Sequence, residues 1–525
     1  MKKKIASLLL VFAMLCNIFL LAGCSGGDAE TFLEPPTVEI PESGYDGSAV
    51  TITFYHTMGS NLRDVLDKYI AKFNEVYPNI TIEHTQVGSY DDVRDTISTE
   101  IAVGAGPNIA YCYPDHVALY RRANKVVALD TFINSTVSDG VGGILGLTEE
   151  QIDNFIDGYY AEGYQFDDGS RMYTLPLSKS TEVLYYNKTF FDGCVRIYNS
   201  EILIDMDGNP IYVTDDEGNV VTDGEGNPQT QVNPNYHNEN YNLYVPTTWD
   251  EMEEICAKIK AIDPTCVPLG YDSEANWFIT MCEQMGSGYT SSTKVNGSNF
   301  LFDNETNREF IKEFNDWYNK GYVTTQEIYG AYTSGLFTAI GDNVQKSYMS
   351  IGSSAGATHQ RPTAGADGSY PFEVGITTVP QIDAENPKVI SQGPSVCIFD
   401  KENDMEVIAS WLFVKYLTTT VEFQAAFSIA SGYVPVLENV AENASYAAFL
   451  ENADGGDFIA ALSAKVCLEQ ADAYYTSPAF VGSSTARDEV GVLLRKCISY
   501  EGEDLDAYIK KAFKDAIDAC KYMAR

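Results

Sequence analysis

One pentapeptide of the chain has the spacing of a serine hydrolase nucleophile turn. Gly352-Ser353-Ser354-Ala355-Gly356 matches G-x-S-x-G and follows the apolar segment Tyr348-Met349-Ser350-Ile351, as a strand-to-helix nucleophile turn requires. Such a serine needs a histidine later in the chain to accept its proton. The only histidine downstream is His359, five residues on. The pattern therefore favours a small-residue turn whose hydroxyl and N–H groups face something polar over an esterase site.

Other reactive residue types are present without the spacing that their chemistry needs. The 74 acidic residues make carboxylate pairs so common that they do not indicate a glycosidase. The five histidines are scattered and no C-x-x-C pair occurs, so we expect no zinc or redox site and no cofactor. Outside the first 24 residues, we expect mostly buried free thiols, with one or two disulfides as the alternative. These cysteines are Cys112, Cys194, Cys256, Cys266, Cys282, Cys397, Cys467, Cys497 and Cys520.

Residues 193–245 carry a repeated turn signal. Acid-Gly-Asn triplets recur around Gly208, Gly218 and Gly226 and are separated by β-branched residues, which predicts a meander of short strands and tight turns. The alternative is a calcium loop, because carboxylates and Asn supply oxygen ligands. An EF-hand loop needs Gly at position 6, whereas counting from Asp205 places it at position 4. An exposed β-rich insertion is therefore favoured.

Aromatic residues are the most informative of the polar-tipped side chains. There are 35 tyrosines, and several lie beside Gly, Ser or Pro at predicted strand ends. Aromatic faces with hydroxyl donors suit sugar-like ligands, which offer C–H faces and OH rims. Taken singly, such a residue more often belongs to the core than contacts a ligand. The candidates are Tyr90, Trp277, Tyr433 and the pair Tyr185-Tyr186.

Strands and helices alternate at the start of the globule. Val50, Ile52 and Phe54 alternate as in a half-buried strand, and residues 62–77 show helical spacing that Pro78 ends. A strand at 80–82 and a helix at 91–103 follow, which is the pattern of a parallel α/β sheet. Further amphipathic helices are predicted at 249–262, 306–320, 403–418 and 503–523.

Length and charge limit the classes of partner. The 525 residues suggest two or three domains or lobes, and 34 basic against 74 acidic residues give a formal net charge of −40. Nucleic-acid binding depends on Lys and Arg neutralising phosphates, so we expect no nucleic-acid partner. An anionic membrane surface also repels such a chain unless something else holds it there.

The N-terminus supplies such an anchor. Three lysines precede an apolar run from Ile5 to Ala22, as in a secretory signal peptide, with an uncleaved transmembrane helix as the alternative. Leu21-Ala22-Gly23-Cys24 resembles the bacterial lipobox, in which the cysteine is lipidated. We therefore predict a signal peptide at 1–23, a palmitate-bearing lipoprotein cysteine at Cys24 and a flexible tether over 24–48. The protein would be extracytoplasmic, on the outer face of the cell membrane.

Six segments appear in an order that resembles a known family. The chain from about 50 to 523 resembles the family 1 extracellular solute-binding proteins of bacterial ABC importers. Within that family it is most similar to the branch of the sn-glycerol-3-phosphate and multiple-sugar binders. The segments are ITFYHTMG (52–59), KFNEVYPNITI (72–82), AVGAGPNI (102–109), MYTLPLSKSTEVLYYNK (172–188), VPTTWDEM (245–252) and ASGYVPV (430–436).

The resemblance implies an α/β, two-lobed periplasmic-binding-protein fold with several crossovers between the lobes. It assigns 49–165 plus 347–395 to the first lobe and 166–346 plus 396–525 to the second, with the β-rich insertion 193–245 in the second. The function it implies is binding, not catalysis. A monomer would capture a carbohydrate or glycerophospho-ligand between its lobes and deliver it to ABC permease subunits. The alternatives are an extracytoplasmic carbohydrate-active hydrolase and a surface adhesion or structural lipoprotein.

The resemblance also implies ligand contacts, each carried over from a matching motif. The arginine that holds phosphate in the glycerol-phosphate binder corresponds to Arg487. The branch also has an acidic residue after the first strand, where this chain continues with Gly59-Ser60-Asn61. The implied ligand-binding residues are Tyr90, Ser180, Trp277, Ser353, Ser354, Gly393, Tyr433 and Arg487.

Overall fold

The computed structural model describes residues 34–341, 343–452 and 458–523. The predicted signal peptide and Cys24 lie outside these residues. The predicted flexible tether is wrong for its second half, because Val38 and Tyr45 are buried in the core beside the first sheet. Their apolar side chains dock this segment although its composition is Gly-, Pro- and acid-rich. Within the described ranges, no helix is both long and apolar enough to cross a membrane.

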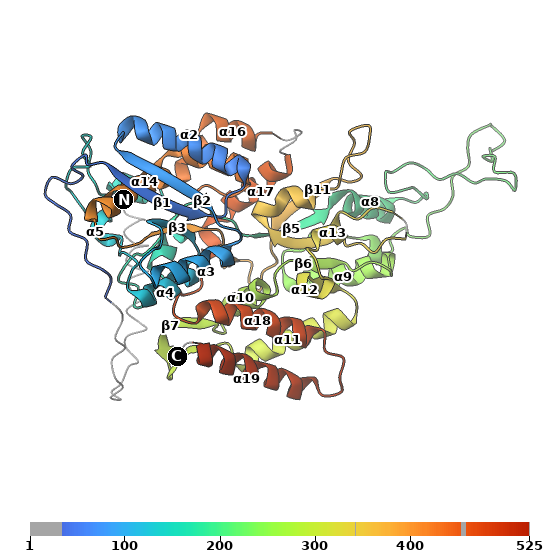
Figure 1. Ribbon diagram of the computed structural model, residues 1–525. Helices are drawn as coiled ribbons and strands as arrows, with labels where there is room; N and C mark the ends of the chain where they lie inside the picture. Colours follow the sequence, from blue (N-terminus) through green and yellow to red (C-terminus); the bar gives the residue numbers. More distant parts are fainter. Residues whose placement is uncertain (1–33, 342, 453–457, 524–525) are drawn as a thin grey trace. The chain divides into compact units, whose positions relative to one another are not determined.

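The first of two five-stranded sheets has the order β2-β1-β3-β13-β4. Strands β1, β2 and β3 run parallel, and β13 is antiparallel to both β3 and β4 (Figure 1). The predicted alternation in the first strand is confirmed, since Val50, Ile52 and Phe54 are all buried. The strands are β1 (Val50–His56), β2 (Ile80–Gln86), β3 (Ile109–Cys112), β4 (Leu175–Pro176) and β13 (Ser395–Ile398).

Amphipathic helices cover the first sheet. In the first helix Leu66, Tyr69 and Phe73 are buried at helical spacing, as predicted, and the helix ends before Pro78. Ser89 starts α3 with a capping box, its side chain bonded to the N–H of Asp92. The helices that pack here are α2 (Ser60–Val76), α3 (Tyr90–Ile101), α4 (Pro114–Tyr120), α14 (Asp404–Thr419), α15 (Val421–Ser431) and α16 (Ala444–Leu450). Three short helices, α5 (Asp130–Ile133), α6 (Glu149–Asp153) and α7 (Asp157–Ala161), lie in the segment between α4 and β4.

The second sheet has the order β11-β5-β10-β6-β9. Strand β5 is antiparallel to β10 and β11, whereas β10, β6 and β9 are parallel. The predicted lobe boundaries are therefore wrong in two places. Segment 347–395 was assigned to the first lobe, but its strands β10 and β11 pair in the second sheet. Strand β13 and helices α14 and α15, which lie at or after residue 395, belong to the first sheet and not to the second lobe. The strands are β5 (Glu182–Asn187), β6 (Leu269–Tyr271), β9 (Val323–Thr325), β10 (Met349–Ser353) and β11 (Val374–Thr378).

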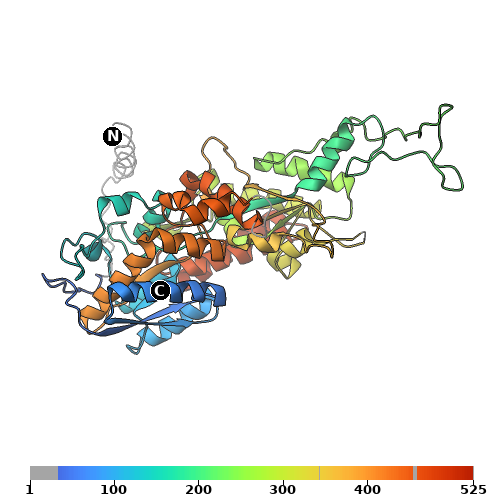
Figure 2. The same cartoon turned by 90° about the horizontal axis from the view of Figure 1, so that it is seen from above.

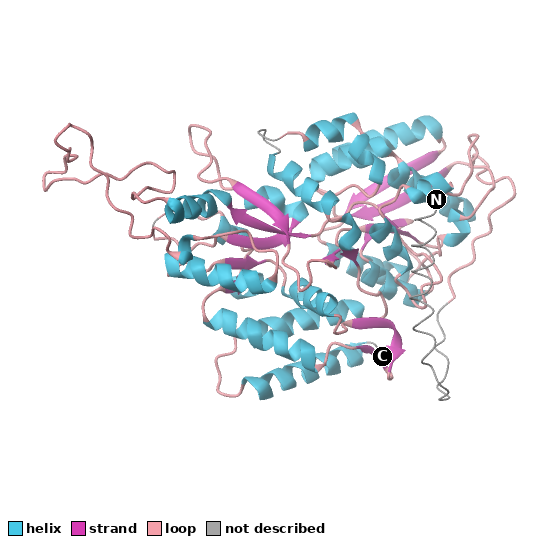
Figure 3. Ribbon diagram, turned by 180° about the vertical axis from the view of Figure 1, so that it is seen from behind, coloured by secondary structure: helices cyan, strands magenta, loops and turns pink. Residues whose placement is uncertain are grey.

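Helices stack beneath the second sheet (Figures 1 and 3). The predicted helices at 249–262, 306–320 and 503–523 are confirmed as α9, α11 and α19, within two residues. The helices of this half are α8 (Lys188–Asn199), α9 (Trp249–Ile262), α10 (Glu274–Met285), α11 (Glu305–Asn319), α12 (Gln326–Tyr329), α13 (Ser334–Phe337), α17 (Phe458–Glu469), α18 (Ser483–Ile498) and α19 (Leu505–Met523). Two small pairings complete the fold, β7 (Thr290–Val295) with β8 (Ser298–Phe300) and β12 (Val389–Ile390) with β14 (Tyr474–Tyr475).

An arm of residues 200–238 projects from the end of α8 (Figure 2). The predicted meander is present, but its strands are reduced to isolated bridges such as Tyr212 with Thr230. Three turns repeat one geometry, in which an aspartate accepts the N–H groups of residues two and four positions on and a glycine in between has a positive φ. The aspartates are Asp205, Asp215 and Asp223.

The outer part of the arm carries none of the core, which makes it removable. Replacing residues 213–229 with Asn-Gly would join the paired residues Tyr212 and Thr230 through a two-residue hairpin turn. We expect the free energy of unfolding, measured in urea, to change by less than about 0.5 kcal/mol. A loss of about 2 kcal/mol or more would show that this part of the arm packs against the globule.

Candidate functional site

A cavity of about 570 Å³ lies between the two sheets within the part of the chain described. Its wall takes residues from the β2–α3 turn, the start of α4, the N-terminus of α10, helix α18 and the crossover that leads into β13. The lining residues include Tyr90, Asp91, Tyr113, Asp115, His116, Glu162, Glu274, Asn276, Tyr289, Glu327, Ser391, Gly393, Arg487 and Asp488.

Tyrosines form the side of the cavity that belongs to the first sheet. The ring of Tyr90 stacks on Tyr111, with 5.8 Å between centroids, and lies 4.7 Å from the ring of Tyr113. Its hydroxyl is 3.3 Å from that of Tyr433. Burial raises the pKa of Tyr90 well above its usual value, so the group stays a neutral hydroxyl. This side therefore offers aromatic faces and hydroxyl groups.

An arginine is fixed on the opposite side. Arg487 of α18 donates from Nη1 to Oδ1 of Asn276 (2.6 Å), and the Asn276 amide donates to Oε1 of the buried Glu182 (3.0 Å). The Tyr271 hydroxyl donates to the other oxygen of Glu182 at 2.6 Å. Burial raises the pKa of Glu182 to about 7, although these two hydrogen bonds oppose the rise. The chain of contacts sets the position of the guanidinium.

The crossovers between the sheets meet at Lys179, which lies between β4 and β5. Its buried ammonium donates to Oε1 of Glu162 (2.5 Å), to the carbonyl of Gly393 (3.1 Å) and to the hydroxyl of Ser395 (3.0 Å). Its backbone pairs with Val434, after α15. Three chain segments are thus joined at one point behind the cavity.

Gly393 is required by this arrangement. Its φ is +88°, and an added Cβ would lie 2.7 Å from the carbonyl oxygen of Ser178 and 2.9 Å from the Cα of Lys179. A side chain would push apart two crossover segments, because both obstructing atoms belong to the backbone. The glycine is therefore needed for the close approach of the crossovers, whereas its contact with a ligand stays a prediction.

Three of the eight sequence-predicted residues line the cavity: Tyr90, Gly393 and Arg487. Two more lie directly behind the wall. Tyr433 reaches Tyr90 through its hydroxyl, and Ser180 pairs with the lining residue Gln392. These five residues come from segments far apart in the sequence.

The other three predicted residues do not line the cavity. Trp277 is fully buried in the second core, stacked on Tyr271 with ring centroids 4.9 Å apart. The serine turn uses its hydroxyls locally: Ser353 accepts the N–H of Ala355 (3.3 Å) and Ser354 accepts the N–H of Thr181 (3.1 Å). The polar partner expected of this turn is thus the crossover segment itself.

Several lining residues were missed by the sequence reasoning. Asp115 and His116 follow the buried strand β3 and Pro114, a loop-to-helix position that could have been marked as a candidate. Polar atoms of three buried residues of the cavity wall have no hydrogen-bond partner among the described residues. They are His116 Nδ1, Tyr289 Oη and Ser391 Oγ.

Two α/β units joined by crossovers, with a polar cavity between them, have the architecture of a two-lobed solute-binding protein. The chain matches bacterial extracellular solute-binding proteins over residues 68–452, most of its length, and it belongs to that family. A curated relative is the sn-glycerol-3-phosphate-binding periplasmic protein UgpB of Shigella flexneri, 27% identical over 148 residues. That alignment covers 27% of this chain and only 30% of the relative.

Solved structures share the fold at low identity. UgpB from Mycobacterium tuberculosis, in complex with glycerophosphocholine, has a TM-score of 0.63 at 16% identity and covers 91% of this chain and all of that one. The cyclic α-maltosyl-1,6-maltose binding protein from Arthrobacter globiformis has a TM-score of 0.61 at 16% identity, over 90% of this chain and all of its own. The sugar-binding protein MalE from Xanthomonas citri has a TM-score of 0.62 at 15% identity, and the match covers 90% of this chain and 98% of MalE. The predicted two-lobed α/β fold is confirmed.

The pKa of Glu182 makes stability depend on pH. Its folded pKa of about 7 lies above the unfolded value of 4.5, so the unfolded state ionises first as pH rises. The contribution of Glu182 to the free energy of unfolding should therefore fall by about 3 kcal/mol between pH 4.5 and 7 and stay level above. Urea unfolding of the wild type and of Glu182→Gln, whose side chain is neutral throughout, should give curves that diverge over this range.

An exposed control, Glu501→Gln, should follow the wild-type pH dependence. Parallel curves for the wild type and Glu182→Gln would show that the buried carboxyl does not titrate abnormally.

Proposed function

We propose that this protein is the lipid-anchored substrate-binding component of an ABC importer. It captures a carbohydrate or a glycerophospho-compound in the cavity between its sheets and delivers it to membrane permease subunits. The observation that carries the proposal is the cavity itself, whose wall is formed by loops and helices from both halves of the fold and includes buried polar atoms without partners. A ligand that bridges the two sides stabilises one arrangement of the lobes over others.

The lining suits a polyhydroxylated ligand. Tyr90 and Tyr113 offer aromatic faces, and the hydroxyls and amides around them are directed hydrogen-bond donors and acceptors. The ligands of these relatives are sn-glycerol 3-phosphate, glycerophosphocholine and a cyclic maltosyl-maltose. These compounds share a body rich in oxygen, and this chain's cavity is proposed to accept the same class.

The contacts proposed for the ligand are Tyr90, Gly393 and Arg487, because these predicted residues line the cavity. Tyr433 and Ser180 are proposed to position the wall. Membership of an extracellular family places the chain outside the cytoplasm. Attachment through a lipid on Cys24 is proposed from the residues Leu21-Ala22-Gly23-Cys24.

A thermal-shift panel tests the binding function. Neutral oligosaccharides, amino sugars, glycerophosphodiesters and sn-glycerol 3-phosphate are added separately, and the added compound is analysed chemically afterwards. At a hundredfold excess over Kd, a ligand stabilises the folded state by about 2.7 kcal/mol. We expect one class to raise Tm and to be recovered unchanged. Chemical turnover would indicate an enzyme, and no shift across the panel would contradict a binding role.

Arg487→Ala, with Arg122→Ala as control, tests the proposed site. Arg122 is an exposed arginine that does not line the cavity. Loss of the cavity arginine should weaken binding of the stabilising compound by about 1–3 kcal/mol, measured by calorimetric titration, whereas the control should bind as wild type. Equal affinities of the two variants would place the ligand elsewhere.

A further inference from the structure

The cavity wall is strongly acidic. Six carboxylic side chains line it, against one arginine: Asp91, Asp115, Glu162, Glu274, Glu327 and Asp488. A formal chain charge of −40 makes acidic surface common, but a cavity is a different case because its walls exclude water and concentrate the field. The question is how many of these carboxylates are already neutralised by the protein.

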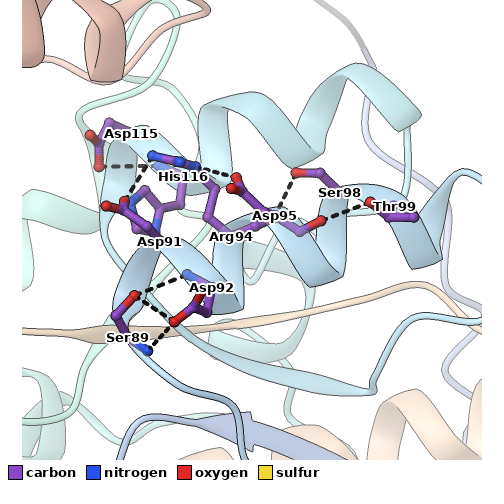
Figure 4. A network of polar contacts seen from close by, with 9 residues as sticks. All are labelled: Ser89, Asp91, Asp92, Arg94, Asp95, Ser98, Thr99, Asp115 and His116. Carbon is purple, nitrogen blue, oxygen red and sulfur yellow. Dashed lines mark hydrogen bonds and ion pairs between the residues drawn. The ribbon is translucent and has the colours of Figure 1, made fainter.

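Ion pairs account for three of the six. Arg94 binds Asp91 (2.8 Å), Lys179 binds Glu162 (2.5 Å) and Arg495 binds Glu327 (2.9 Å). Arg94 also forms an ion pair with Asp95, so its charge is shared between two carboxylates, as Figure 4 shows. Among the residues that the structure describes, Asp115, Glu274 and Asp488 have no such pair.

The three remaining carboxylates have neutral partners at most. Asp115 accepts the backbone N–H of His116 at 3.1 Å, beside the network drawn in Figure 4. Glu274, which is buried, accepts the backbone N–H of Glu327 at 2.9 Å. Burial raises the pKa of Asp488; the nearby Arg94 opposes this rise, and repulsion from Asp91 and Asp115 adds to it. Negative charge is therefore crowded at this wall.

The single cavity arginine does not balance them. Arg487 is bonded to Asn276, and its field also acts on the buried Glu182 behind it. Against its one positive charge stand the three unpaired carboxylates Asp115, Glu274 and Asp488. Nor does histidine compensate, because burial and the nearby arginines lower the pKa of His116 and keep it neutral.

Unpartnered atoms and aromatic rings mark the same wall as a ligand site. His116 and Tyr289 are at least nine-tenths buried, line the cavity, and carry His116 Nδ1 and Tyr289 Oη without hydrogen-bond partners. The rings of Tyr90 and Tyr113 lie in the same wall, and aromatic faces attract organic cations. The negative charge of the wall and its aromatic rings therefore both favour a ligand with a cationic group.

We propose that the ligand carries a positively charged nitrogen on its polyhydroxylated body, which is held at Asp115, Glu274 and Asp488, and that a simple phosphate monoester is rejected. This inference rests on the proposed binding function and specifies its substrate class. The cationic nitrogen could belong to an amino sugar or to the choline or ethanolamine group of a glycerophosphodiester. Arg487, next to Asp488 on α18, lines the same cavity and would hold an oxygen-rich part of the same molecule.

Two matched pairs of compounds separate the sources. The first pair is the β-1,4-linked glucosamine disaccharide and cellobiose, which differ by ammonium and hydroxyl groups. The second is glycerophosphocholine and sn-glycerol 3-phosphate. In calorimetric titration at pH 7 and low salt, we expect the cationic member of one pair to bind about tenfold more tightly or better than its partner. The preference should shrink as salt is raised.

Asp488→Asn, with Asp153→Asn as control, tests the acidic wall. Asp153 is exposed and does not line the cavity. Removing the charge of Asp488 should reduce the preference for the cationic compound by about threefold or more and leave the control unaffected. Because its raised pKa makes the charged form unfavourable in the folded state, the variant should also unfold at the same or a higher temperature at pH 7, which shows that it is folded.

Each remaining outcome is decisive. Equal or better binding of the neutral or monoester compound in both pairs overturns the inference and leaves the binding function standing. If only neutral oligosaccharides from the wider panel stabilise the protein, the inference is likewise overturned and the binding function stands. If no compound in either pair or in the wider panel binds, the inference and the proposed function fall together.

Discussion

The buried ammonium of Lys179 is the contact on which the arrangement of the two sheets depends. It joins the crossover between β4 and β5 to Glu162 and to Gly393 and Ser395 at the entry to β13. A buried charge that loses its partner costs about 3–5 kcal/mol, so these segments hold together as one unit. Lys179 therefore ties the crossover segments to one another beside the cavity.

Local sequence patterns predicted the fold well where one element decides its own structure. The alternation of Val50, Ile52 and Phe54 and the helical spacing of 249–262 each had one satisfactory arrangement, and both are present. The lobe boundaries failed because membership of a sheet is decided by pairing over long distances. Segment 347–395 carries strands for the second sheet, although it precedes β13 of the first.

The site was only partly predictable for a related reason. Tyr90 and Arg487 belong to motifs, and both line the cavity. Trp277 was implied by the same family resemblance, but its ring is equally suited to the core, where Tyr271 and Phe314 enclose it. Glu274 and Asp488 could not be singled out among 74 acidic residues, because their importance comes from missing ion-pair partners, which only the folded arrangement specifies.

The central claim is that a small solute binds between the two sheets against Tyr90 and Arg487. The most direct measurement is a crystal structure of the protein with the compound that raises its Tm most. The account predicts electron density for that compound in the cavity, in contact with both residues, with its chemical structure intact. Density at any other surface, or for a cleaved product, would contradict it.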